Sequence, residues 1–148
     1  MSAGEAKSAA APARMVDDDE EKKEGEICAI CLEALPRFGL GAIWFTCCGK
    51  IIHNECDLQL MNSLCDKNCP MCRAPTASSD EQEHTRALRW AGKGKAWAMV
   101  FVATDFYLGR GVSASKEMAR LWHEKAAEQG NPNAQSKLGY MFFLYARQ

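Results

Sequence analysis

The chain has 148 residues, of which 25% are charged and 47% are hydrophobic, and its net charge is −1. This length suits one ordinary domain or two small ones, and the pI near 6.3 gives no electrostatic reason to expect a nucleic-acid partner. The longest apolar run, residues 96–103, is too short to span a bilayer, so we expect no membrane segment.

Residues 1–25 are expected to form a disordered acidic tail. Ala, Ser and Pro come first, and residues 17–26 then carry seven acids against two lysines, with almost nothing apolar to bury. The opening also lacks the apolar core of a signal peptide. We therefore expect a reducing compartment, cytoplasmic or nuclear, in which cysteines bind metals more often than they form disulfides.

Residues 26–76 form a cysteine-rich module. Eight potential zinc ligands fall in four pairs, which are Cys28 and Cys31, Cys47 and Cys48, His53 and Cys56, and Cys69 and Cys72. Thiolates and imidazoles suit zinc, and a two-residue gap aims both members of a pair at one ion. Because four ligands complete a tetrahedral site, eight predict two structural Zn²⁺. The alternative is that these cysteines are buried thiols or form disulfides, but such cysteines do not show the repeated CxxC, HxxC and CPxC spacings.

Short elements are expected between these pairs. Residues 42–46 predict a strand, Gly49 and Lys50 a turn, and residues 51–52 the return strand. Asn54 is a candidate N-cap for a helix that runs to about residue 64. The module is too small for a self-sufficient core, so metal binding would supply much of its folding free energy.

At Cys69-Pro70-Met71-Cys72-Arg73 the module resembles a RING finger. The resemblance implies a cross-brace, with Cys28, Cys31, His53 and Cys56 on one zinc and Cys47, Cys48, Cys69 and Cys72 on the other. It also implies a ubiquitin ligase that forms no covalent intermediate and orients the ubiquitin held by a charged conjugating enzyme. The positions that match the family's contacts with this enzyme are Ile30, Leu60, Pro70 and Arg73.

One ligand pair departs from that family. Its second pair usually reads Cys-x-His, and the count back from His53 places Lys50 where the second ligand would be. The ammonium group of Lys50 has no lone pair and cannot bind zinc, so we expect Cys47 to be the second ligand of this pair. The adjacent Cys47 and Cys48 then require a loop that differs from the usual one. Cys65 is left over and is interpreted as a free thiol. The ligand order also fits a PHD finger, although Lys67 stands where that family usually has an aromatic residue.

The remaining residues predict an all-α segment. After a linker at 74–79, helices are expected at 80–91, 95–108, 115–129 and from about 133 onward, with Ser79 and Ser115 as N-caps and Gly130 after the third helix. Positions 94, 98, 102, 103 and 106 recur 36 residues later, a period typical of helical-hairpin repeats. His84 and His123 have no Cys or acidic partner at metal spacing and are expected on the surface.

Two stretches of this segment resemble Sel-one-like repeats. They are YLGRGV at 107–112 and the pattern from Ala119 and Trp122 through KAAEQG at 125–130, which continues at Ala134 and Leu138. The resemblance implies a protein-interaction scaffold over residues 79–148, with one full and one partial repeat and no catalytic residue. Trp97 and Trp122 are then core residues.

The fold expected is a small α+β zinc-stabilised cross-brace domain followed by all-α helical-hairpin repeats. The preferred function is a RING-type ubiquitin-protein ligase whose partners are a conjugating enzyme, ubiquitin and a protein substrate recruited by the helices. Two alternatives stay open. One is a non-enzymatic zinc-stabilised adaptor, and the other is a PHD-like histone reader.

Overall fold

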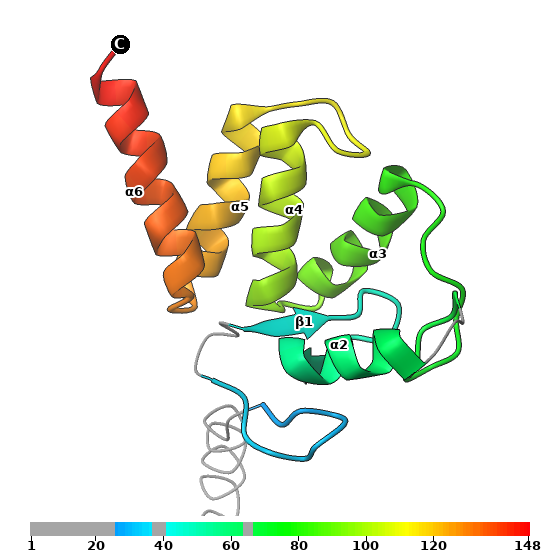
Figure 1. The fold of residues 1–148 in the computed structure, drawn as a ribbon. Helices are drawn as coiled ribbons and strands as arrows, with labels where there is room; N and C mark the ends of the chain where they lie inside the picture. Colours follow the sequence, from blue (N-terminus) through cyan, green and yellow to red (C-terminus); the bar gives the residue numbers. More distant parts are fainter. Residues whose placement is uncertain (1–25, 37–40, 64–66) are drawn as a thin grey trace, which may run out of the picture.

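The computed structural model describes residues 26–36, 41–63 and 67–148. In chain order its elements are β1 (Ala42–Trp44), β2 (Ile51–His53), α2 (Asn54–Ser63), α3 (Asp80–Gly92), α4 (Ala96–Leu108), α5 (Lys116–Glu128) and α6 (Pro132–Ala146). The cysteine-rich part lies beside one end of the helices, with α4 directly over β1 (Figure 1). The expected acidic tail and Cys65 lie outside the described residues.

The sheet is a single antiparallel hairpin in which Ala42 pairs with His53, Ile43 with Ile52 and Trp44 with Ile51. The first strand ends two residues earlier than expected because the chain turns at once, and Phe45 donates its N–H to the carbonyl of Lys50 at 2.9 Å. Helix α2 begins at Asn54, directly after β2. A small core surrounds Ile52, which is fully buried, as is Cys28, and Leu35 is buried beside them.

The helix boundaries lie within one residue of those expected for α3, α4 and α5, and the caps predicted at Ser79 and Ser115 are confirmed. Ser79 accepts a hydrogen bond from the N–H of Gln82, and Ser115 accepts one from Met118. Gly130 follows α5 with a φ of 82°, the left-handed conformation that a helix end favours and that glycine adopts without a steric penalty.

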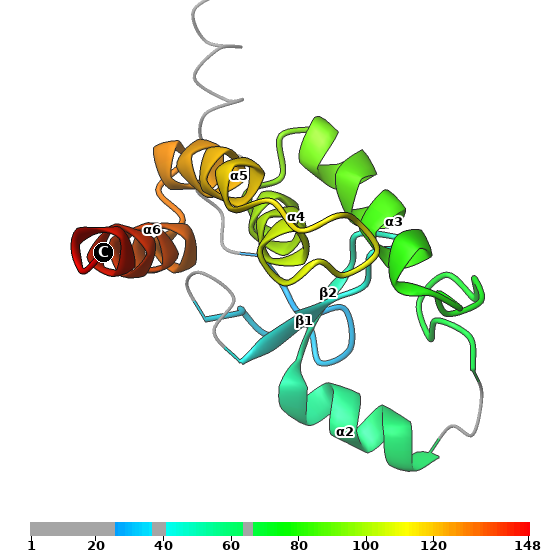
Figure 2. The ribbon, with the colours of Figure 1, turned by 90° about the horizontal axis from the view of Figure 1, so that it is seen from above.

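Helices α3 to α6 pack in sequence, each against the next. Figure 2 shows α4 between α3 and α5, with α6 on the far side of α5. The 36-residue repeat holds on the inner face, where Ala98 of α4 and Ala134 of α6 are both fully buried. The equivalence between the two repeats does not extend to the outer face, because Phe106 of α4 packs on the core whereas its counterpart Phe142 of α6 is 56% exposed.

Among the described residues, five helices and a two-stranded sheet thus give helical hairpins that follow a cysteine-rich part. In this part of the chain, every helix is too short or too polar to serve as a transmembrane span.

Candidate metal sites and their surroundings

The two CxxC loops have the same backbone geometry. Leu32 donates its N–H to the carbonyl of Cys28 at 3.1 Å, and Arg73 donates to Cys69 at 2.9 Å. Leu32 and Arg73 share a φ of 62°, the left-handed region. An isolated antiparallel bridge closes each loop, Ile27 with Ala34 and Asn68 with Pro75. Each loop is thus a tight knuckle of the kind that presents two thiols to one ion.

The first knuckle shares a donor group with the junction between β2 and α2. The group is Cys28, Cys31, His53 and Cys56, whose donor atoms lie within 4.8 Å of one another. The Sγ atoms of Cys28 and Cys56 are 3.8 Å apart, and Cys31 Sγ lies 3.3 Å from Nδ1 of His53. Because β2 ends at His53 and α2 begins at the next residue, strand and helix each supply one donor.

The second knuckle shares a donor group with the turn after β1. The group is Cys47, Cys48, Cys69 and Cys72, again with donor atoms within 4.8 Å of one another. Cys48 Sγ lies 3.9 Å from Cys69 Sγ, and Cys72 Sγ lies 3.6 Å from Cys47 Sγ. The adjacent Cys47 and Cys48 therefore both reach one centre. Lys50 is exposed and belongs to neither group.

These separations match a tetrahedral zinc site. Zinc–sulfur bonds of about 2.3 Å at tetrahedral angles place two sulfurs about 3.8 Å apart. The three sulfur pairs measure 3.6 to 3.9 Å, far longer than the about 2.05 Å of a disulfide. The Cys₃His and Cys₄ donor sets and their spacing therefore fit zinc, and each group can hold one metal ion.

The protonation equilibria of the thiols also favour a cation. Burial alone would raise the pKa of Cys28, but backbone hydrogen bonds from its own loop and from His53 outweigh burial and lower that pKa to about 6. Burial and the neighbouring cysteines raise the pKa of Cys56 to about 11, and burial and neighbouring cysteines also raise the pKa of Cys47. Thiols crowded in this way resist forming several thiolates unless a positive ion takes the place of their protons.

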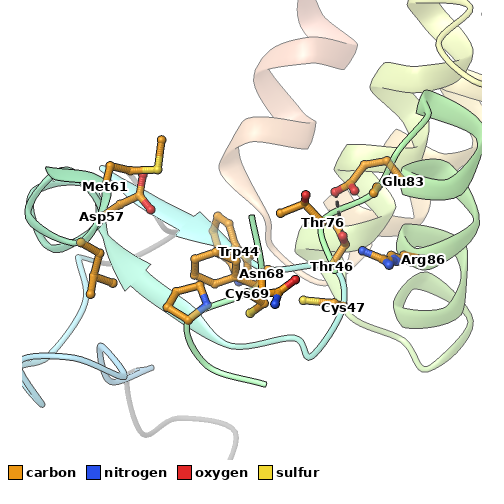
Figure 3. Close-up of a pocket in the computed structure, with 14 residues that line it drawn as sticks. Trp44, Thr46, Cys47, Asp57, Met61, Asn68, Cys69, Thr76, Glu83 and Arg86 are labelled. Carbon is orange, nitrogen blue, oxygen red and sulfur yellow. Dashed lines mark hydrogen bonds between the residues drawn. The ribbon is translucent and has the colours of Figure 1, made fainter. Parts of the chain in front are cut away.

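Two of the four positions matched to conjugating-enzyme contacts line one cavity. Leu60 from α2 and Pro70 from the second knuckle lie on the wall of a cavity of about 200 Å³. Figure 3 shows this cavity, with Trp44, Cys69 and Glu83 among its labelled lining residues. Ile30 is 38% exposed and Arg73 is also exposed, but neither residue lines this cavity. The four positions thus lie on the same module without forming a single pocket.

Helix α3 supports the turn that carries Cys47 and Cys48. Trp90 donates its indole N–H to the carbonyl of Thr46 at 2.7 Å, and the Thr46 hydroxyl donates to Glu83 at 2.7 Å. Gly49 has a φ of 70°, and a Cβ at this position would come within 2.6 Å of the Trp90 ring. Sequence reasoning missed this contact, because Thr46 and Trp90 are far apart in the chain and only Gly49 marked the turn.

The expectation that His84 and His123 lie on the surface is wrong, since they are 5% and 2% exposed. His84 Nδ1 lies 3.0 Å from the buried carboxylate of Asp105, which is also 3.3 Å from Arg110. Burial raises the pKa of Asp105 although His84 and Arg110 oppose the shift. The partner of His84 comes from the next helix, so spacing along the chain could not reveal it.

No protein-family model matches the chain, and no curated protein matches it either. Among solved structures, the chain is similar to the crystal structure of a Sel1 repeat protein from Oxalobacter formigenes, with 30% sequence identity and a TM-score of 0.43. The match covers 45% of this chain and 27% of that chain. The matched part therefore spans less than a third of the length of that protein.

Proposed function

We propose that the chain is a RING-type ubiquitin-protein ligase with two structural zinc ions. The supporting observation is that the donor groups interleave, since the first and third ligand pairs form one group and the second and fourth form the other. This interleaving is the cross-brace that RING fingers use. In this proposal residues 26–76 bind a ubiquitin-charged conjugating enzyme, and the helical repeats at 79–148 recruit the protein substrate.

The chain itself would supply no nucleophile in this reaction. Ile30, Leu60 and Pro70 would contact the conjugating enzyme, and Arg73 would hydrogen-bond both that enzyme and ubiquitin through its forked guanidinium. Restricting a mobile donor to one reactive geometry speeds attack by the substrate amine without a covalent intermediate. Zinc would hold the two knuckles in place and take no part in the bond changes.

Ubiquitin discharge from a panel of charged conjugating enzymes tests this function directly. We expect the zinc-loaded parent to accelerate discharge and Ile30→Ala to lose the acceleration with both zinc ions retained. Leu121→Ala, which removes an exposed apolar side chain from α5, is the matched control and should discharge like the parent. Retained discharge by a folded Ile30→Ala protein would contradict the contact assignment.

A non-enzymatic adaptor is the second candidate. The observation in its favour is that α3 supplies Glu83 and Arg86 to the wall of the cavity that contains Leu60 and Pro70. Helix α3 therefore occupies part of the surface beside Leu60 and Pro70, where a conjugating enzyme would have to bind. Absence of binding to every conjugating enzyme in the panel, with two zinc ions bound, would support the adaptor over the ligase.

The hypothesis of a PHD-like histone reader has less support. A methyl-lysine cage needs aromatic faces that are open to the ligand. Trp44, the one tryptophan of the cysteine-rich module, instead stacks on Trp97 of α4 with ring centroids 5.7 Å apart. A screen of histone-tail peptides would expose such an activity, and we expect that screen to find no binding.

A further inference from the structure

A cavity of about 140 Å³ lies among α4, α5 and α6, away from the candidate metal sites. Tyr107 of α4, His123 of α5 and Lys137, Tyr140 and Met141 of α6 line it. Tyr140 is 57% exposed and Lys137 is exposed, whereas His123 is 2% exposed. The cavity therefore combines an open, polar rim with a buried histidine.

His123 is the unusual member of this group. Its Nδ1 is buried and has no hydrogen-bond partner among the described residues. A buried polar atom without a partner costs free energy, so native structures seldom retain one without a reason. Burial and the positive charge of Lys137 lower the pKa of His123 to about 4, so the ring is neutral at physiological pH and one of its nitrogens carries a proton.

A second cavity, of about 320 Å³, adjoins the first and shares Tyr107 and Met141 with it. Its other lining side chains include Lys116, Leu144 and Arg147. Among the described residues that line the two cavities, none has an acidic side chain. The combined surface is therefore basic, with tyrosines and an apolar floor.

We propose that these two cavities form a docking site for an acidic peptide, in which a glutamate carboxylate lies beside Lys137 and accepts a hydrogen bond from the ring of His123. The carboxylate would give His123 the partner that it lacks, and charge-assisted bonds of this kind are about twice as strong as neutral ones. A second acidic residue would meet Lys116 or Arg147, and an apolar side chain between the two acids would rest on Met141 and Leu144.

Charge complementarity favours a peptide over nucleic acid. Only Lys116, Lys137 and Arg147 supply positive charge here, whereas nucleic-acid sites commonly contact about six to ten phosphates. The chain as a whole carries a net charge of −1, which supplies no general attraction for a long polyanion. The use of this site for substrate recruitment rests on the proposed function, but peptide binding itself does not.

Fluorescence anisotropy with the full zinc-loaded chain tests the site without a conjugating enzyme. The probes are labelled eight-residue peptide mixtures with alternate positions fixed as Glu or, in the control mixture, as Gln. We expect the Glu mixture to bind about tenfold more tightly, and Lys137→Gln to remove most of that advantage. Lys125→Gln makes the same charge change on α5, where the ammonium lies over Trp122, and should change affinity by less than about twofold.

A spectroscopic measurement separates binding in the cavity from general charge attraction. The imidazole nitrogen resonances of His123, assigned by their absence in His123→Gln, should shift when the Glu mixture is added. The proposal would be overturned if the two mixtures bound with equal affinity, or if Lys125→Gln lost as much affinity as Lys137→Gln. It would also be overturned if the His123 resonances did not shift, or if a labelled single-stranded oligonucleotide bound more tightly than the Glu mixture. Failure of ubiquitin discharge would leave these results unaffected, so the two proposals can fail separately.

Discussion

The indole N–H of Trp90 lies 2.7 Å from the carbonyl oxygen of Thr46, and this hydrogen bond joins helix α3 to the turn that presents Cys47 and Cys48. It is accompanied by the close approach of the Trp90 ring to Gly49, where no side chain larger than hydrogen fits. The helical half therefore helps to set the backbone of one candidate metal site.

Trp90→Phe should weaken the second metal site selectively. The variant keeps most of the ring packing but leaves the Thr46 carbonyl without its donor, a loss of about 1 kcal/mol. We expect half of the bound zinc to reach a chelator faster than in the parent, while the other half is released at the parental rate. Trp122→Phe, in a ring that packs on the helical core, is the control. Equal release rates for both variants would contradict the support assigned to Trp90.

Zinc stoichiometry should distinguish ligand cysteines from the remaining one. Cys72→Ser replaces a thiolate donor with a hydroxyl that does not ionise at neutral pH. The zinc content of this variant should therefore fall from two ions per chain to one. Cys65→Ser and Lys50→Ala should both retain two. Elemental analysis of reduced, gel-filtered protein measures this content. Loss of zinc in Cys65→Ser would show that Cys65 is a ligand and that the ligand set of the second site is wrong.

The paired left-handed residues allow a clean test of Arg73. Arg73→Gly and Leu32→Gly each place glycine at a φ of 62°, where it is less strained than a larger residue, so neither should lose zinc. If Arg73 bridges the conjugating enzyme and ubiquitin, Arg73→Gly should slow discharge by about tenfold or more, equivalent to about 1.4 kcal/mol. Leu32→Gly is the backbone control. Equal slowing in the two variants would remove the specific role of the guanidinium.

The buried His123 should make stability depend on pH. Its pKa is about 4 in the folded protein against 6.5 ordinarily, so the unfolded chain binds the proton more readily. The contribution of His123 to stability is therefore constant well above pH 6.5 and falls as the pH drops from 6.5 toward 4, by at most about 1.4 kcal/mol per pH unit. The other titratable side chains that line its cavity are Tyr107, Lys137 and Tyr140.

Urea unfolding of zinc-loaded protein at several pH values, compared with His123→Gln, measures this dependence. Acid also weakens metal binding, but that loss is common to parent and variant and cancels in the difference. The difference in unfolding free energy between the two proteins should change below pH 6.5. A constant difference would show that His123 does not titrate on unfolding.

Local patterns were enough to predict helices α3, α4 and α5 and the caps at Ser79 and Ser115, but not the cap expected at Asn54, which is instead the first residue of α2. Ser79 and Ser115 act on N–H groups within their own first turn, so neighbouring residues determine the outcome. The contacts between elements were not predictable in this way. His84 meets Asp105, and Trp90 meets Thr46, only because separate elements fold against each other, and no periodicity along the chain encodes those pairings.

The repeat shows the same limit. The 36-residue period correctly paired the buried Ala98 with Ala134, because both belong to the same core cluster, which also contains Ala126 of α5. It could not predict that Phe142 would be exposed, since exposure depends on whether another element covers α6 and not on the helix itself. Sequence similarity between two helices thus predicts their inner contacts better than their surroundings.

The contact between Trp90 and the turn at Thr46 also bears on how the chain can be divided. A fragment that ends at residue 76 would keep all eight candidate ligands but would lose Trp90, Glu83 and the face of α4 on which Trp44 stacks. Such a fragment would expose apolar surface beside the turn that carries Cys47 and Cys48 and would remove the hydrogen bonds that hold that turn. We therefore expect metal loading and helix packing to belong to one cooperative unfolding unit, in which the two halves stabilise each other although their compositions suggest independent modules.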